Sequence, residues 1–334
     1  MVSTSTTILT GIKPTGTPHI GNYLGTIAPA LRRAREFDHA YFFIADYHAL
    51  NSVTDPQALR ALTHSVAATW LAAGLDPAKI HFYRQSDISE IFELETILTT
   101  VTPKGWMNKM HAYKAQVDRN NEASKATDSG VNMGLYTYPL LMASDILIFQ
   151  SNAVPVGKDQ VQHVEIARDI AQRFNSEYKT TALTLPEYIL EDGIEELPGL
   201  DGRKMSKSYG NTIPLFATRS EWEQSVKKIV TDSLTHTPET FRATTFYKLY
   251  AAIAPSESSE RLVAAFTSGS IGWKDAKDQL VDALEARFGE ASKTYMTLMA
   301  DTSTIDTILH TSAGEIRTKA RTTLESVKSA VGIR

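Results

Sequence analysis

Short apolar runs alternate with helix-length segments through the first two hundred residues, and this alternation constrains the fold more than any other feature. Strands are predicted at 7–10, 40–45, 80–84, 146–150 and 182–185, and helices between them at 24–37, 56–73 and 160–174. Strands separated by helices form βαβ units, so we expect an α/β fold with a parallel sheet covered on both faces. Ligands in such folds bind beyond the carboxyl ends of the strands.

The strand pattern stops near Phe216, and the rest of the chain predicts helices only. Four are expected: one opened by the capping box Ser220–Glu223, one after Pro255, one with Leu280, Leu284 and Phe288 on one face, and one over 308–331. A length of 334 residues exceeds that of a usual single domain. We therefore expect a second, all-α domain.

The composition is that of an ordinary globular protein that needs no cross-links. Hydrophobic residues make up 42% of the chain and charged residues 22%, and the absence of cysteine excludes disulfides and thiolate chemistry. The start MVSTSTTILTG lacks the pattern of a signal peptide, and no segment approaches the ~20 apolar residues of a membrane span. We expect a cytosolic protein with no membrane partner. A formal net charge of −4 argues against a protein that coats nucleic acid by bulk charge, although it does not exclude a local basic face, and we expect no DNA partner.

The stretch TGIKPTGTPHIGNYLG, residues 10–25, follows the first predicted strand and is a candidate nucleotide site. It does not contain the G-x-G-x-x-G pattern of dinucleotide-binding folds. Gly11, Gly16 and Gly21 would let a base or phosphate approach the main chain, and His19 and Asn22 share one face of the next helical turn. That turn presents free N–H groups to an anion. A tight turn with a capping histidine is the structural alternative.

The stretch GLDGRKMSKSYGN, residues 199–211, is a candidate polyphosphate loop. Lys204 and Lys207 flank Ser206 between glycines, and two flexible ammonium groups suit a phosphate chain whose charge moves during a reaction. A solvated basic loop is the alternative for any single pair of lysines.

Together, the two stretches resemble the paired motifs of the class I aminoacyl-tRNA synthetases. Asn22, where most of the family has histidine, is the form seen in the tryptophanyl-tRNA synthetases. Residues 134–175, ADYHAL at 45–50 and VTDS at 230–233 are also similar to that subclass. A tyrosyl-tRNA synthetase, a nucleotidylyltransferase and a non-catalytic RNA-binding paralogue are the alternatives.

The resemblance implies a Rossmann-like catalytic domain over residues 1–215, followed by a helical tRNA anticodon-binding domain over residues 216–334. It implies a ligase that activates L-tryptophan with ATP to tryptophanyl-adenylate and transfers it to tRNA(Trp) for protein synthesis. Mg²⁺ would accompany the ATP phosphates rather than occupy a dedicated protein site. A homodimer is implied as well.

The helical spacing of Tyr138, Met142 and Asp145 places all three on one face, where the Asp145 carboxylate would accept a hydrogen bond in the amino-acid pocket. An indole N–H is a donor only, so a lone acceptor beside an apolar wall suits tryptophan. Tyrosine enzymes typically have glutamine in place of Met142. A buried core stripe with a capped Asp is the structural alternative.

The resemblance also assigns roles to individual residues. His19, Asn22, Lys204 and Lys207 would act on the phosphate chain and the leaving pyrophosphate. The ATP site would comprise Lys13, Pro14, Thr15, Gly21, Asn22, Gly157, Lys158, Asp159, Leu197, Lys204, Met205, Ser206, Lys207 and Ser208. The tryptophan site would comprise Leu9, Gly11, Tyr138, Met142, Asp145 and Gln160, with Tyr138 and Gln160 on the α-amino group. Lys13 and Leu9 stand where many relatives have glutamine and phenylalanine, which affects metal dependence and pocket shape respectively.

Two groups of basic residues are candidate tRNA contacts. One comprises Lys104, Lys109, His111, Lys114, Arg119 and Lys125, and the other Arg317, Lys319, Arg321 and Lys328. The resemblance places the acceptor end near the first group and the anticodon on the helical domain. Solvated helix faces explain either group equally well.

Overall fold

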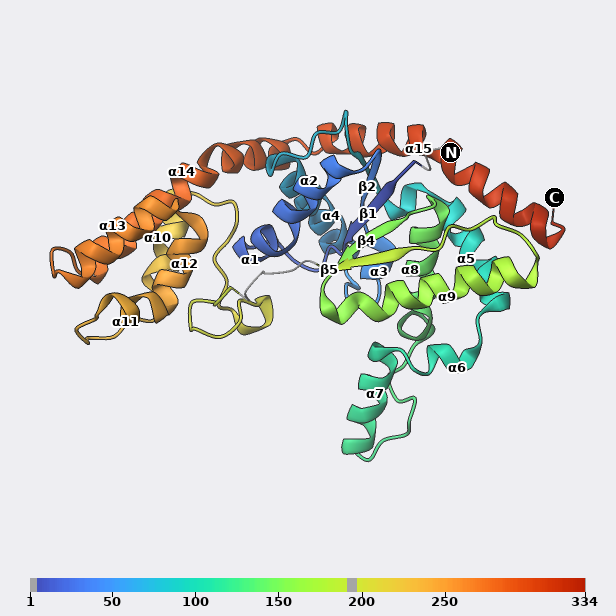
Figure 1. Ribbon diagram of the computed structural model, residues 1–334, viewed down its shortest axis with the longest axis horizontal. Helices are drawn as coiled ribbons and strands as arrows, with labels where there is room; N and C mark the ends of the chain where they lie inside the picture. The colour runs from blue at the N-terminus through green and yellow to red at the C-terminus, as the bar shows by residue number, and fades with distance from the viewer. Residues whose placement is uncertain (1–4, 191–196, 334) are drawn as a thin grey trace.

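The computed structural model describes residues 5–190 and 197–333 (Figure 1). One five-stranded parallel sheet lies at its centre, with the strand order β3-β2-β1-β4-β5. The strands are β1 (Thr7–Ile12), β2 (His39–Ile44), β3 (His81–Arg84), β4 (Ala153–Val156) and β5 (Glu187–Leu190). The chain builds outward from β1 to β3 and then returns to the other side of β1 with β4. This reversal makes the boundary between β1 and β4 the point where an open α/β sheet binds its ligand.

Helices cover both faces of the sheet and extend well beyond one end of it. They are α1 (Ile20–Asn22), α2 (Ala28–Arg33), α3 (Asp46–Ala49), α4 (Pro56–Ala72), α5 (Glu90–Val101), α6 (Lys104–Met107), α7 (His111–Glu122), α8 (Met133–Ile148), α9 (Val161–Glu177), α10 (Arg219–Lys227), α11 (Pro238–Ala243), α12 (Thr245–Ile253), α13 (Ser256–Thr267), α14 (Trp273–Ala300) and α15 (Ser303–Val331). A π-helical segment, Tyr23–Ile27, joins α1 to α2. No helix among the described residues is long and apolar enough to span a membrane.

Alternate residues of the strands face opposite layers, as the period of two in a strand requires. Ile8, Phe42 and Phe82 belong to a core shared with α2 and α4. Their neighbours Leu9, Phe43 and Tyr83 belong to a second core built with α5, α8 and α9. The predicted α/β class with a parallel sheet is therefore confirmed.

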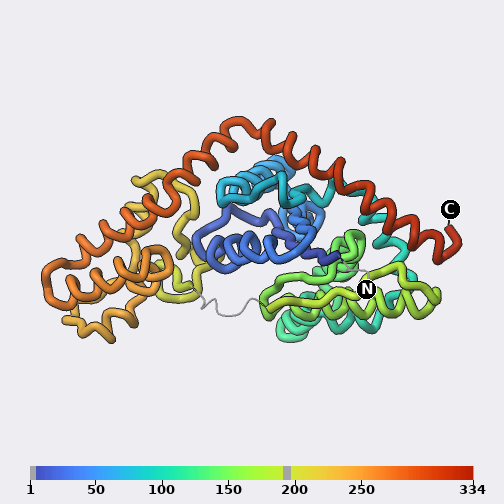
Figure 2. Tube along the Cα trace, turned by 45° about the horizontal axis from the view of Figure 1, so that its top comes forward, coloured from blue at the N-terminus to red at the C-terminus, as the bar shows by residue number. Residues whose placement is uncertain are grey.

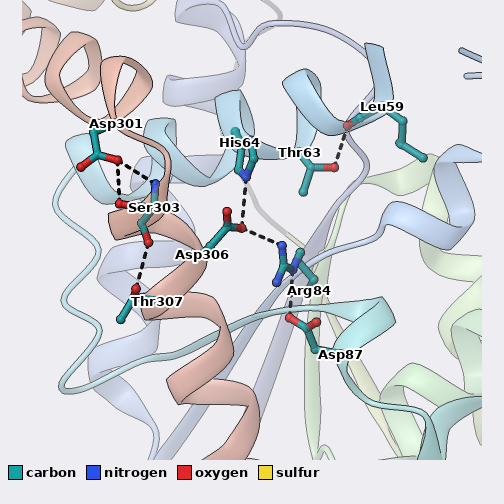
Figure 3. Close-up of polar contacts among 9 residues, drawn as sticks. All are labelled: Leu59, Thr63, His64, Arg84, Asp87, Asp301, Ser303, Asp306 and Thr307. Carbon is teal, nitrogen blue, oxygen red and sulfur yellow. Dashed lines mark hydrogen bonds and ion pairs between the residues drawn. The ribbon is translucent and has the colours of Figure 1, made fainter. Parts of the chain in front are cut away.

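The last two helices form one long run along the molecule (Figure 2). Helix α14 packs against α4 and α10, and α15 packs against β3 and α5. Within its first turn, Asp306 accepts hydrogen bonds from His64 Nε2 (3.1 Å) and Arg84 Nη1 (2.8 Å) (Figure 3). Residues 303–331 thus pack on the sheet-bearing half of the chain. The division at residue 215 stays a prediction, and residues 1–4, 191–196 and 334 of its two ranges lie outside the described residues.

Two predicted strands are wrong. The run 146–150 is the end of α8 and the turn after it, and the strand follows as β4. The run 182–185 precedes β5 rather than forming it. Residues Ile146–Ile148, in the last turn of α8, and Phe149, which caps it, are fully buried, and a short apolar run buried on all sides has no period that separates helix from strand.

The helical half also differs in detail from the prediction. Its first helix is capped two residues earlier, by Thr218, which exchanges hydrogen bonds with Glu221 in a capping box. The described residues after 216 form six helices rather than four.

Candidate active site

The candidate site lies where the sheet order reverses, at the carboxyl ends of β1 and β4. Lys13, Pro14 and Thr15 follow β1, and residues 157–160 follow β4. Pro14 is buried, whereas the side chains of Lys13 and Thr15 are exposed. The predicted ATP residues of both loops therefore lie at the same end of the sheet, beyond the carboxyl ends of neighbouring strands.

His19 caps the first turn after β1 and is nearly buried. Its backbone N–H donates to Asn22 Oδ1 (3.1 Å), so the two residues of the motif fix each other. Burial and the Lys207 ammonium lower the pKa of His19 to about 4. Its imidazole is therefore neutral at pH 7, and Nδ1 is buried without a partner among the described residues. A polar atom left in this state is available to a ligand.

The lysine-bearing loop, residues 197–214, which contains the motif at 199–211, lies directly against this turn. Ile20 N–H donates to Ile213 O (3.1 Å), and His19 pairs with Pro214 in a short bridge. A Cβ added to Gly21 would lie 3.0 Å from His19 Nδ1 and 3.5 Å from Met205 Sδ. Two motifs about 180 residues apart in sequence thus meet in space, as their assignment to one site requires.

Lys207 reaches the first glycine-rich loop. A Cβ on Gly16 would lie 3.0 Å from Lys207 Nζ, so the end of the lysine side chain lies close to the backbone at position 16. Although Lys207 is exposed by area, the partial burial of its ammonium lowers its pKa. The neighbouring hydroxyls of Ser206 and Ser208 lie 2.8 Å apart. Leu197 O accepts from Met205 N–H (2.9 Å), which joins the start of this loop to its centre.

Asp145 lies on α8, fully buried, and is not a lone acceptor. Gln85 Nε2 lies 2.9 Å from both of its oxygens, and His48 Nε2 lies 3.0 Å from Oδ2. When the Asp145 carboxylate is ionised it only accepts, and Nε2 of His48 then carries the hydrogen. Burial raises the pKa of Asp145 although both donors oppose the shift. A carboxylate can accept about four hydrogen bonds, two at each oxygen. Among the described residues, Gln85 and His48 use both positions of Oδ2, whereas Gln85 alone uses Oδ1, so Oδ1 can accept one more.

Tyr138 lies on α8, one turn before Met142 and two turns before Asp145, as predicted. Its side chain contacts α9. Its phenol oxygen lies 2.6 Å from His163 Nε2. In the next loop, Gln160 Nε2 donates to Asp159 Oδ2 (2.9 Å). The carbonyl oxygen of Gln160 and the phenol of Tyr138 are therefore the polar groups that these residues offer to an ammonium group.

The remaining predicted residues are placed chiefly by packing. Leu9 is almost fully buried on β1, within the core shared with α8. A Cβ on Gly11 would lie 2.5 Å from the Phe43 ring, so glycine is required there by the ring itself. Met142 is partly buried against the same core.

Four polar residues of the site were not predicted: His48, Gln85, His163 and Asn211. His48 lies within the ADYHAL stretch, and Gln85 directly follows β3, so both stand at carboxyl ends of strands. That position was an available signal for them.

Most of the second group of basic residues form ion pairs within the protein. Arg317 Nε and Arg321 Nε donate to Glu90 Oε1 (2.9 and 3.0 Å), and Lys328 Nζ pairs with Glu93 (2.9 Å). These pairs join α15 to α5. The first group lies on α6, on α7, in the turn between them and in the loop after α7, and α7 projects from the body of the molecule (Figure 1).

Comparison with known proteins agrees with the geometry. The family model for class I tRNA synthetases (W and Y) matches residues 3–289. The tryptophan–tRNA ligase of Xanthomonas axonopodis pv. citri is 46% identical over 337 residues, covering 100% of this chain and 78% of that protein. That of Bordetella pertussis is 48% identical over 332 residues, with 98% and 73% covered. The crystal structure of tryptophanyl-tRNA synthetase from Campylobacter jejuni, complexed with ADP and tryptophan, superposes with a TM-score of 0.89 at 35% identity, covering 98% of this chain and 100% of that one.

Proposed function

The chain belongs to the tryptophan–tRNA ligases among the class I tRNA synthetases, and from that premise we propose how its site performs the family's reaction. It activates L-tryptophan with ATP to give tryptophanyl-adenylate and pyrophosphate, and then transfers the tryptophanyl group to tRNA(Trp). The tryptophan carboxylate is already a nucleophile at pH 7. The chemical task is to bring two anions together and to stabilise the charge that develops on the leaving group.

In the first step, a carboxylate oxygen of tryptophan forms a bond to the α-phosphorus of ATP. The bond from that phosphorus to the bridging oxygen breaks, and pyrophosphate leaves with the electron pair. We assign His19 and Asn22 to the phosphate chain, and Lys204 and Lys207 to the departing pyrophosphate together with the Mg²⁺ that ATP carries. Residues 13–15, Gly21 and residues 157–159 line the rest of the nucleotide.

The observation that carries this proposal is the approach of Lys207 to the loop after β1. Its ammonium stands beside Gly16 and, after burial, is the second cause that lowers the pKa of the neighbouring His19. A cation held at the end of a glycine-rich loop, at the reversal point of a parallel sheet, is suited to a polyphosphate.

Tryptophan is selected in this proposal by an acceptor deep in the pocket. Asp145 Oδ1 accepts the indole N–H, while Gln85 and His48 hold the carboxylate in place. Tyr138 and Gln160 take the α-amino group, and Met142 packs on the indole edge. Supporting this choice, Met142 offers no hydrogen bond of the kind that a phenol requires.

The proposal extends to partners and place. We assign the tRNA acceptor end to the basic residues of α6 and α7, and the anticodon to the helical half, across a homodimer in the cytosol. Size-exclusion chromatography with light scattering tests the dimer. Loss of aminoacylation but not of adenylate formation in Lys114→Ala tests the acceptor contact.

The activity itself is tested by ATP–pyrophosphate exchange with each of the twenty amino acids, without tRNA. Exchange with tryptophan alone supports both the chemistry and the Asp145 pocket. Exchange with tyrosine instead would retain the class and overturn the pocket assignment. No exchange with any amino acid would favour a non-catalytic RNA-binding paralogue.

A further inference from the structure

Asn211 occupies the inside of the lysine-bearing loop and is 3% exposed. Its Oδ1 accepts from Ser206 N–H (2.8 Å). Its Nδ2 donates to Lys204 O (3.1 Å) and to Asp201 Oδ1 (2.7 Å). The side-chain amide of Asn211 therefore accepts one hydrogen bond from the segment that carries both lysines and donates two to it.

The backbone around Asn211 closes the same loop. Leu200 N–H donates to Asn211 O (2.8 Å), so both the main chain and the side chain of residue 211 bind the loop's opening residues. A Cβ on Gly199 would lie 2.2 Å from Asn211 Nδ2, which leaves no room for a side chain at position 199. Glycine at 199 is thus required by the amide at 211.

The contacts of Asn211 lie next to both ammonium-bearing residues. It binds the carbonyl of Lys204 itself and the N–H of Ser206, the residue immediately before Lys207. Asp201, its third partner, also accepts from Arg203 N–H (3.1 Å), and the Arg203 guanidinium stacks on Tyr209 at 4.5 Å. The amide thereby joins the two ends of the loop from within.

We propose that Asn211 is a positioning residue for adenylate formation: its amide fixes the backbone from which Lys204 and Lys207 reach the leaving pyrophosphate. The inference rests on the proposed function of these lysines. Losing the amide would remove its hydrogen bonds to Ser206 N–H and Lys204 O, so the loop would relax and the ammonium groups would lose their placement. Neither ATP nor tryptophan needs to touch Asn211.

The test compares Asn211→Ala with a matched control in exchange assays on the full chain without tRNA. Asn120→Ala is that control, because Asn120 is also 3% exposed and its amide also makes three hydrogen bonds, but within residues 116–129. A misplaced charge costs on the order of 10- to 100-fold in rate, so kcat should fall by that factor in Asn211→Ala. The KM for tryptophan should stay unchanged, and Asn120→Ala should retain kcat.

A pH profile separates positioning from general loss of structure. In Asn211→Asp, the new carboxyl faces Asp201, with Arg203 as the other charged neighbour, and two adjacent carboxylates raise the pKa of one of them. The protonated carboxyl can donate to Asp201 and still accept from Ser206 N–H. Activity relative to the unaltered enzyme should therefore rise as pH falls from about 8 to about 6. The double variant Asp201→Asn/Asn211→Asp exchanges the donor and the acceptor between the two positions and should recover activity at the higher pH.

Each outcome decides a separate question. If the unaltered enzyme exchanges tryptophan and Asn211→Ala matches Asn120→Ala, the positioning role is wrong and the proposed function stands. If the unaltered enzyme does not exchange tryptophan, the proposed function fails, and this inference fails with it. If thermal melting shows that Asn211→Ala does not fold, Asn211→Asp decides the matter: a flat ratio across pH overturns the inference.

Discussion

The phenol oxygen of Tyr138 lies 2.6 Å from Nε2 of His163, and burial keeps both groups neutral. Burial lowers the pKa of His163 to about 4, assisted by the nearby His111, and raises that of Tyr138 to about 12. At pH 7 the imidazole is neutral and the phenol keeps its proton. Tyr138 can then donate to His163 and turn a lone pair toward the tryptophan ammonium.

His163→Leu removes the acceptor that orients this phenol. Loss of one such hydrogen bond is worth about 1 kcal/mol, so the KM for tryptophan should rise about fivefold, with kcat changing less. His163→Gln supplies a carbonyl acceptor and should recover part of the affinity. Exchange kinetics at varied tryptophan measure both variants, and an unchanged KM in His163→Leu would contradict the assignment.

Lys207→Ala removes the cation proposed to face the leaving pyrophosphate. Loss of one preorganised charge contact lowers a rate by ~10²–10³, so single-turnover adenylate formation should slow by that order. Tryptophan binding should change little, because the lysine stands on the phosphate side of the site. Lys79→Ala, at an exposed lysine outside the site, serves as control. Equal losses in rate and in tryptophan affinity would be evidence against this role.

Asp145→Ala removes the acceptor assigned to the indole and leaves Gln85 and His48 without their shared partner. Unpaired buried donors cost about 1–3 kcal/mol each, so tryptophan affinity should fall by about tenfold or more and thermal stability should fall with it. Ser144→Ala is the matched control, since Ser144 is also fully buried on α8 and its hydroxyl, among the described residues, donates to the helix carbonyl of Leu140. Equilibrium dialysis with tryptophan distinguishes the two, and equal affinities would exclude Asp145 from the pocket.

The sheet was predictable because its strands carry local apolar runs separated by helix-length segments. Three predicted strands lie within a residue or two of β1, β2 and β3. The failure at 146–150 has a physical cause: the end of α8 is buried on every side, so its sequence has neither the period of a helix nor that of a strand. The flanking sequence could not reveal this error, because the strand β4 begins only three residues after the predicted one and a strand is expected in this part of the chain in either case.

The site was predictable only where its residues lie close in sequence. Each of its two motifs is recognisable from the sequence, because His19 lies three positions from Asn22 and Lys204 three positions from Lys207. The partners of Asp145 lie 97 and 60 residues away, and no local pattern links them to it. Likewise, Arg317 and Arg321 read as exposed basic residues until the fold brings Glu90 beside them.

Asp306→Asn tests the attachment of α15 to the sheet. Asp306 joins α15 to His64 on α4 and to Arg84 at the end of β3. The carboxylate is partly exposed, so water screens these pairs, and the free energy of unfolding should fall by about 1 kcal/mol. Glu315→Gln on the same helix, with its side chain exposed and 3.8 Å from His81, should change stability less. Urea titration measures both, and equal midpoints would contradict the expectation.

The two buried histidines predict how stability depends on pH. The pKa of His19 and that of His163 fall from 6.5 to about 4 on folding, so the unfolded chain binds more protons between these values. Their contribution is complete above pH ~6.5 and is lost as pH falls toward ~4, by at most about 3 kcal/mol for each histidine. Carboxyl groups titrate in the same range, so the comparison must be made between variants. His163→Leu lacks one of the two groups, and its urea midpoint should fall less than that of the unaltered protein between pH ~7 and pH ~5. Equal falls would mean that His163 is protonated in the folded state.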